Sequence, residues 1–85
     1  MFTPPVLTEE EKIAKHYESM GHSVTLINEV IAGTKMADES VEDRQGCVDR
    51  NVEHLELMVA KDYWTTESMT DVNSAITAGK AYTAS

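Results

Sequence analysis

The sequence has little of what stabilises most small secreted proteins. Its 85 residues include one cysteine, Cys47, so no internal disulfide can form. Secreted domains of this size usually carry several cysteines, and the opening stretch MFTPPVLTEEEK lacks the basic start and the apolar run of a secretory signal. The longest apolar run, Leu57–Ala60, is far shorter than a membrane span. We therefore expect a cytoplasmic protein that makes no membrane contact.

Basic residues are also scarce. Seven Lys and Arg stand against 15 Asp and Glu, which gives a formal net charge of −8. The excess of acids occurs in both halves of the chain, so it is not an acidic tail. Binding to a phosphate backbone needs the opposite sign, and we expect no direct nucleic-acid binding. The charge is compatible with a basic protein partner, and equally with a surface that only keeps the protein soluble.

Proline occurs only near the N-terminus, at Pro4 and Pro5. The two rings exclude helix there and predict an extended N-terminal arm over residues 1–7. The arm either frays or lies on a groove of its own domain or of a neighbour. Residues 8–85 are long enough for a single small helical domain with a shallow core, and their stability is marginal without excellent packing or a partner.

A first helix is predicted over residues 9–32. Thr8 and Glu11 form a capping-box pattern, and Gly33 is a natural left-handed cap at the other end. Apolar residues recur at alternating steps of four and three along one face, as on a helix that packs against another. They are Ile13, Tyr17, Met20, Val24, Ile27 and Ile31, with Leu26 and Val30 beside them.

Two more helices follow. Asp38 or Ser40 can cap a helix over about 39–62, and the short connection predicts that it folds back on the first as an antiparallel hairpin. A third, shorter helix is predicted over about 66–82. Thr65 or Thr66 can cap it, and its apolar stripe includes Gly79. The fold class expected is all-α: a long helical hairpin with a shorter third helix packed on it.

Two interior glycines, Gly21 and Gly46, weaken the predicted helices, since each costs about 1 kcal/mol relative to alanine. One explanation is that each leaves room for a large side chain of the facing helix. Register in the hairpin places Leu26 level with Gly46, so we expect Leu26 to fill the space there.

Cysteine and histidine crowd into the stretch RQGCVDRNVEHLELMVAKDYW, yet helical spacing separates them. Cys47 and His54 are seven residues apart, roughly 10 Å along a helix axis, and no single ion bridges that distance without a third segment. Cys47 is more typical of a small buried residue than of a nucleophile. No P-loop, dinucleotide turn or metalloprotease motif occurs. We therefore expect a protein that is not an enzyme and that has no cofactor and no metal site.

The residues that suggest a function are apolar and aromatic side chains that could bind another protein. The first helix offers more apolar surface than a short third helix can cover, which favours self-association or binding of another protein. Tyr63 and Trp64, at the end of the second helix, either close the end of the bundle or anchor a partner. The candidate interface residues are Ile13, Tyr17, Met20, Val24, Leu26, Ile27, Tyr63 and Trp64.

Two functions are therefore carried forward. The first is a non-enzymatic helical interaction or assembly protein that self-associates. The second is an acidic inhibitor that occupies the basic surface of a nucleic-acid-handling protein, although bases interspersed among the acids count against it.

The stretch RNVEHLELMVAKDYWTTESM, followed by NSAITAGKAY, resembles small acidic helical proteins encoded by bacteriophages. The resemblance covers the C-terminal half and contains no defining motif. It implies an accessory or virion-associated protein that acts in the host cytoplasm or the virion, and it supplies no active residues.

Overall fold

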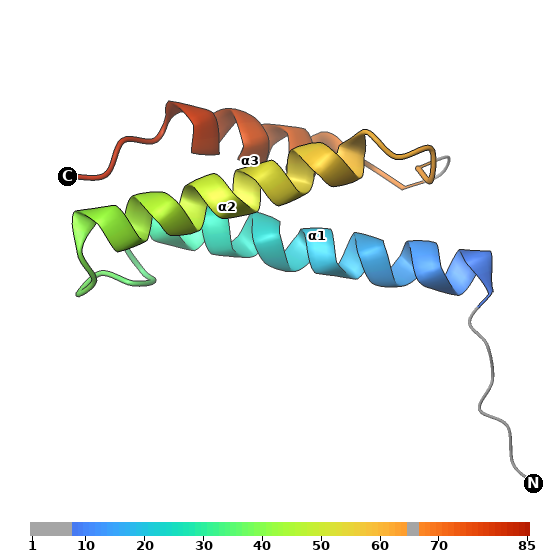
Figure 1. Cartoon of the computed structure of the whole chain (residues 1–85), viewed down its shortest axis with the longest axis horizontal. Helices are drawn as coiled ribbons and strands as arrows, with labels where there is room; N and C mark the ends of the chain where they lie inside the picture. Colours follow the sequence, from blue (N-terminus) through green and yellow to red (C-terminus); the bar gives the residue numbers. More distant parts are fainter. Residues whose placement is uncertain (1–7, 65–66) are drawn as a thin grey trace, which may run out of the picture.

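The chain folds into three helices. A computed structural model describes residues 8–64 and 67–85, in which α1 spans Glu9–Ala32, α2 spans Val41–Val59 and α3 spans Thr70–Ala81. The described part contains no strand. As predicted, two long helices form an antiparallel hairpin and a shorter third helix packs on it (Figure 1). The N-terminal arm predicted over residues 1–7 lies outside the described residues.

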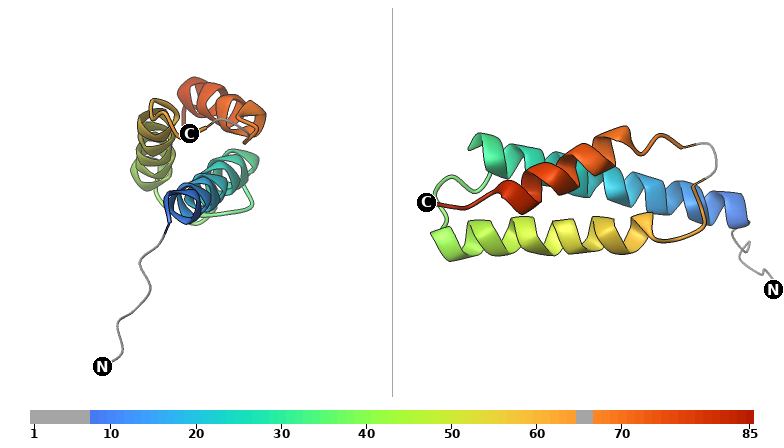
Figure 2. Two further views of the ribbon diagram at one scale, coloured as in Figure 1. Left: turned by 90° about the vertical axis from the view of Figure 1, so that its right-hand side faces the viewer. Right: turned by 90° about the horizontal axis from the view of Figure 1, so that it is seen from above.

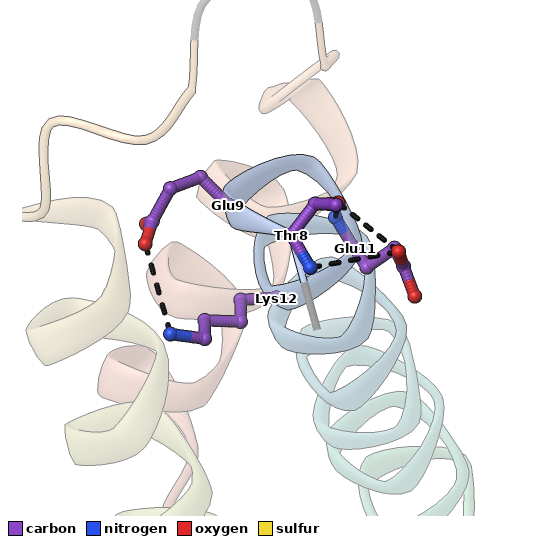
Figure 3. Close-up of polar contacts among 4 residues, drawn as sticks. All are labelled: Thr8, Glu9, Glu11 and Lys12. Carbon is purple, nitrogen blue, oxygen red and sulfur yellow. Dashed lines mark hydrogen bonds and ion pairs between the residues drawn. The ribbon is translucent and has the colours of Figure 1, made fainter. Parts of the chain in front are cut away.

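The start of α1 confirms the predicted capping box. The Thr8 hydroxyl oxygen accepts a hydrogen bond from the Glu11 backbone N–H at 3.1 Å, and the Glu11 carboxylate accepts one from the Thr8 backbone N–H at 3.5 Å (Figure 3). Lys12 and Glu9 add an ion pair across the first turn. At the other end Gly33 has φ 81°, and its N–H donates to the Glu29 and Val30 carbonyls. Both predicted ends of α1 are therefore confirmed.

The other helices are shorter than predicted. Ser40 caps α2 through the Asp43 N–H, so the helix begins at Val41 rather than 39, and it ends at Val59 rather than 62. The N-cap of α3 is Met69, not Thr65 or Thr66, which lie outside the described residues. Ser68 explains the late start, because its carbonyl accepts the Tyr17 hydroxyl of α1 and its hydroxyl accepts the Thr70 N–H.

All three helices contribute to one core. End-on, they form a triangle in which every pair of helices is in contact (Figure 2). The molecule is elongated, with extents of 54 × 31 × 17 Å. None of the described helices is long and apolar enough to cross a membrane. The buried apolar residues are Met20, Ile27, Val30, Cys47, Val48, Val52, Leu55, Met58, Val72 and Ala75.

Helix α3 approaches α2 closely at Gly79. A Cβ at this position would collide with the Val52 side chain of α2, and it would also lie 3.4 Å from Val48 Cγ1. The two glycines singled out from the sequence have no such role. A Cβ at Gly21 would meet nothing within 4 Å, and one at Gly46 would meet only the Arg50 guanidinium. The prediction that Leu26 fills the space at Gly46 is therefore wrong.

Candidate functional site

The cysteine and the histidine that attracted attention in the sequence both lie on α2, where Cys47 is part of the core and His54 is half-buried. Cys47 is 7% exposed and carries a free thiol. The Asn51 side-chain amide donates to its backbone carbonyl at 2.7 Å. The buried Nε2 atom of His54 has no hydrogen-bond partner within residues 8–64 and 67–85. In the same ranges, no three His, Cys, Asp or Glu side chains are grouped so as to hold a metal ion.

The structure divides the α1 residues that were predicted to form an interface. Met20 and Ile27 are fully buried in the core of their own chain. Val24 and Leu26 are half-buried and pack against that core, and Ile13 is half-buried near the start of the helix. In the single chain, the middle of the stripe therefore holds the bundle together, and only its margins remain at the surface.

Tyr63 and Trp64 belong to a group of aromatic rings, named here the aromatic end. Tyr17 and Trp64 have ring centroids 6.0 Å apart, Tyr63 and Trp64 5.6 Å, and His16 stacks on Tyr63 at 5.6 Å. The Trp64 indole N–H donates to the Met58 carbonyl at 2.7 Å. Because the polar tip of Trp64 is satisfied within the chain and both Tyr63 and Trp64 pack against the core, this group closes one end of the bundle.

The opposite end is closed by hydrogen bonds to the C-terminal tail and is named here the polar end. The Gln45 amide donates to the Tyr82 carbonyl at 3.2 Å and accepts from the Ala84 N–H at 2.8 Å. The Arg44 guanidinium donates to the Ser85 carbonyl at 2.9 Å. Sequence reasoning did not assign a role to Gln45. The sequence did contain one indication of such a role, because Gln45 is a single amide side chain that interrupts an otherwise apolar helical stripe.

The outer surface carries a few large apolar side chains. Leu57 on α2 is 62% exposed, Val41 is 44% exposed and Ile31 is 37% exposed. A shallow hollow lies beside α1, and its lining includes Leu26, His22 and Lys35. Leu57 was not among the predicted interface residues, because those candidates were taken from the first helix and from Tyr63 and Trp64.

Charge is unevenly distributed among the helices. α1 and α2 each contain five acidic and two basic residues, whereas α3 contains one of each. On α2, exposed acids recur at helical spacing along one face, and they form an acidic strip. The strip consists of Glu42, Asp49, Glu53 and Glu56. Only Glu56 has an ion-pair partner in the described part of the chain, the Lys80 ammonium at 2.8 Å.

Comparison of the chain with protein-family models, with curated proteins and with solved structures gave no match.

Proposed function

We propose that this protein is a non-enzymatic helical interaction protein that self-associates. The observation that carries the proposal is the exposure of large apolar side chains on the long hairpin. The twelve residues of α3 cover less than the length of α1 and α2, and Leu57, Val41 and Ile31 remain at the surface. Contact with another protein would remove this apolar surface from water and add to a shallow core.

The resemblance of the C-terminal half to small bacteriophage proteins supports an assembly role, as an accessory or virion-associated protein in the host cytoplasm or the virion. A self-associating helical unit suits such a role because repeated contacts between copies of one chain build a larger structure. Cys47 is buried in the core cluster, which supports an interaction role over catalysis.

Sedimentation velocity across low to high micromolar concentrations tests the proposal. We expect the weight-average mass to rise with concentration, because association is governed by mass action. Native mass spectrometry would give the number of copies. A chain that stays monomeric throughout this range contradicts self-association. A pull-down from host cells that captured a specific partner would then leave only hetero-association.

The acidic strip of α2 favours a second candidate function, an acidic inhibitor that binds the basic surface of a nucleic-acid-handling protein. Such an inhibitor needs neighbouring charges of one sign, and Glu42, Asp49 and Glu53 supply them without an intervening base on that strip. Binding of this kind weakens steeply as salt rises. A captured partner whose affinity is unchanged between low and high salt would count against this function.

A further inference from the structure

One row of side chains, on the outer face of α2 and the turn that follows it, combines an apolar centre with opposite charges at its two ends. Glu53 and Leu57 lie four residues apart on α2, and Lys61 follows after four more in the turn that leaves the helix, where its N–H donates to the Met58 carbonyl at 3.0 Å. Side chains four apart form a ridge on a helix surface, and Ala60 keeps the right-handed helical conformation that carries this ridge on to Lys61. Glu53, Leu57 and Lys61 are all exposed, and Leu57 is the most exposed of the large apolar side chains. Within the described residues, neither Glu53 nor Lys61 has an ion-pair partner.

The row points away from the rest of the bundle. The opposite face of α2 carries Val48, Val52 and Leu55, which are buried in the core. A third edge of the helix faces α3, where Glu56 pairs with Lys80 and Gln45 binds the C-terminal tail. None of these contacts involves the row, so a partner can reach it without unfolding any part of the chain.

The row is complementary to itself. When the same ridge of two helices packs antiparallel about a two-fold axis at Leu57, each Glu53 faces the Lys61 of the other chain. Ridges of residues four apart interdigitate in the commonest class of helix packing, at a crossing angle of about −50°. We infer that the row Glu53–Leu57–Lys61 is the contact through which two copies of this chain associate as a symmetric dimer.

Charge directs the contact to this row, which shares Glu53 with the acidic strip, rather than to the rest of that strip. Each chain has a net charge of −8, so two copies repel one another over most of their surfaces. The row contains one acid and one base, so it brings opposite charges together twice in a symmetric pair. The neighbouring side chain of Ala60 is small and exposed. The Arg50 guanidinium lies against Gly46, about three turns before Leu57 on α2.

This inference rests on the self-association proposed above, and charge reversal tests it separately. The variants are Glu53→Lys, Lys61→Glu and the double reversal, examined by sedimentation velocity. Each single reversal places like charges opposite one another at both ends of the contact, and we expect the dissociation constant to rise about tenfold. The double reversal restores opposite pairs, and we expect an affinity close to that of the natural sequence.

Leu57→Glu tests the centre of the row, where it places two carboxylates together at the axis. We expect it to abolish the dimer while circular dichroism shows unchanged helix content, because Leu57 is exposed in the single chain. Val41→Ala is the matched control, since Val41 is also an exposed apolar residue of α2 but lies four turns away. We expect that control to leave the dissociation constant unchanged.

A cross-link gives an independent measurement of the geometry. In a Cys47→Ala background, Leu57→Cys places one thiol of each chain beside the axis, within reach of a disulfide. We expect oxidation to give a covalent dimer, and Val41→Cys to give none.

The outcomes separate the two ideas. Dimers that persist in Leu57→Glu, or a double reversal that fails to restore affinity, would overturn the row as the contact while self-association stands. A natural sequence that stays monomeric at all concentrations would overturn both. If a charge reversal weakens only the binding of a different, captured protein, the row binds that protein and not a second copy of this chain.

Discussion

The two ends of the bundle are closed by different physical means. At the aromatic end, rings from α1 and from the segment after α2 contact one another, with centroids 6.0 Å apart for Tyr17 and Trp64. At the polar end, the helices approach closely at Gly79, and the side chains of α2 bind the backbone of the C-terminal tail. The aromatic end is therefore filled by side chains, whereas the polar end depends on a missing side chain and on hydrogen bonds.

The difference indicates how each end responds to change. Removal of a ring leaves a space that the neighbouring helices fill only in part. Addition of a methyl group at a close approach pushes two helices apart. A hydrogen bond at an exposed position exchanges with water, so its net contribution is small. The expected effects below therefore decrease from the ring, through the glycine, to single polar contacts.

Trp64→Ala has the largest expected effect. The indole contacts Tyr17 and Tyr63 and donates to the Met58 carbonyl. Burial of a whole indole contributes about 3–5 kcal/mol, and because Trp64 is only half-buried we expect a loss of about 2–3 kcal/mol of unfolding free energy. Urea denaturation followed by far-ultraviolet circular dichroism measures it. Leu57→Ala, at concentrations below those of self-association, is the exposed control and should change stability little. Equal losses in the two variants would contradict a closing role for Trp64.

Gly79→Ala tests the close approach near the polar end. The new methyl group would collide with Val52, and we expect a loss of about 2 kcal/mol despite the better helix propensity of alanine. Gly21→Ala is the matched control, because its methyl group meets nothing within 4 Å. It should raise the free energy of unfolding by about 0.5–1 kcal/mol. Thermal unfolding of both variants checks that the two changes in the free energy of unfolding have opposite signs. If both substitutions stabilise the protein, α2 and α3 can separate at little cost in free energy.

These glycines show what the sequence can and cannot predict about packing. Helix content, the hairpin and both ends of α1 follow from local signals, namely the capping box, the apolar period and Gly33. Which glycine lies at a helix crossing depends on the rotation of each helix about its axis. That rotation is fixed by contacts between helices, so the sequence could put Gly79 in an apolar stripe but could not show that Val52 lies against it.

Gln45→Ala tests the hydrogen bonds of the polar end. The amide bonds both the Tyr82 carbonyl and the Ala84 N–H, and loss of these bonds at a half-buried site should cost about 1 kcal/mol. The sharper readout is amide hydrogen exchange, in which the Ala84 N–H should exchange faster. Thr77→Ala is the control, because that hydroxyl bonds only the Asn73 carbonyl of its own helix. Unchanged exchange at Ala84 in Gln45→Ala would show that the tail is held by other contacts.

The candidate interface was harder to predict than the fold. An apolar stripe on a helix identifies residues that avoid water, but it does not say whether their partner is in the same chain. Met20 and Ile27, which were predicted interface residues, are fully buried within this chain, whereas Leu57, which was not, is 62% exposed. The distinction requires the position of α3, which starts late because Tyr17 binds the Ser68 carbonyl.

Tyr17→Phe has the smallest expected effect and separates the ring from its hydroxyl. The substitution removes the 2.8 Å hydrogen bond to the Ser68 carbonyl and keeps the ring beside Trp64. We expect a loss of about 0.5–1 kcal/mol, because water can replace the hydroxyl at this exposed carbonyl. Trp64 is the only tryptophan, so its fluorescence reports on the aromatic end, and its emission maximum should not change. Tyr17→Ala should shift that emission to longer wavelength and cost more, since it opens the ring cluster to water. If Tyr17→Phe destabilises as much as Tyr17→Ala, a hydrogen bond rather than ring packing closes this end, and the contrast between the two ends disappears.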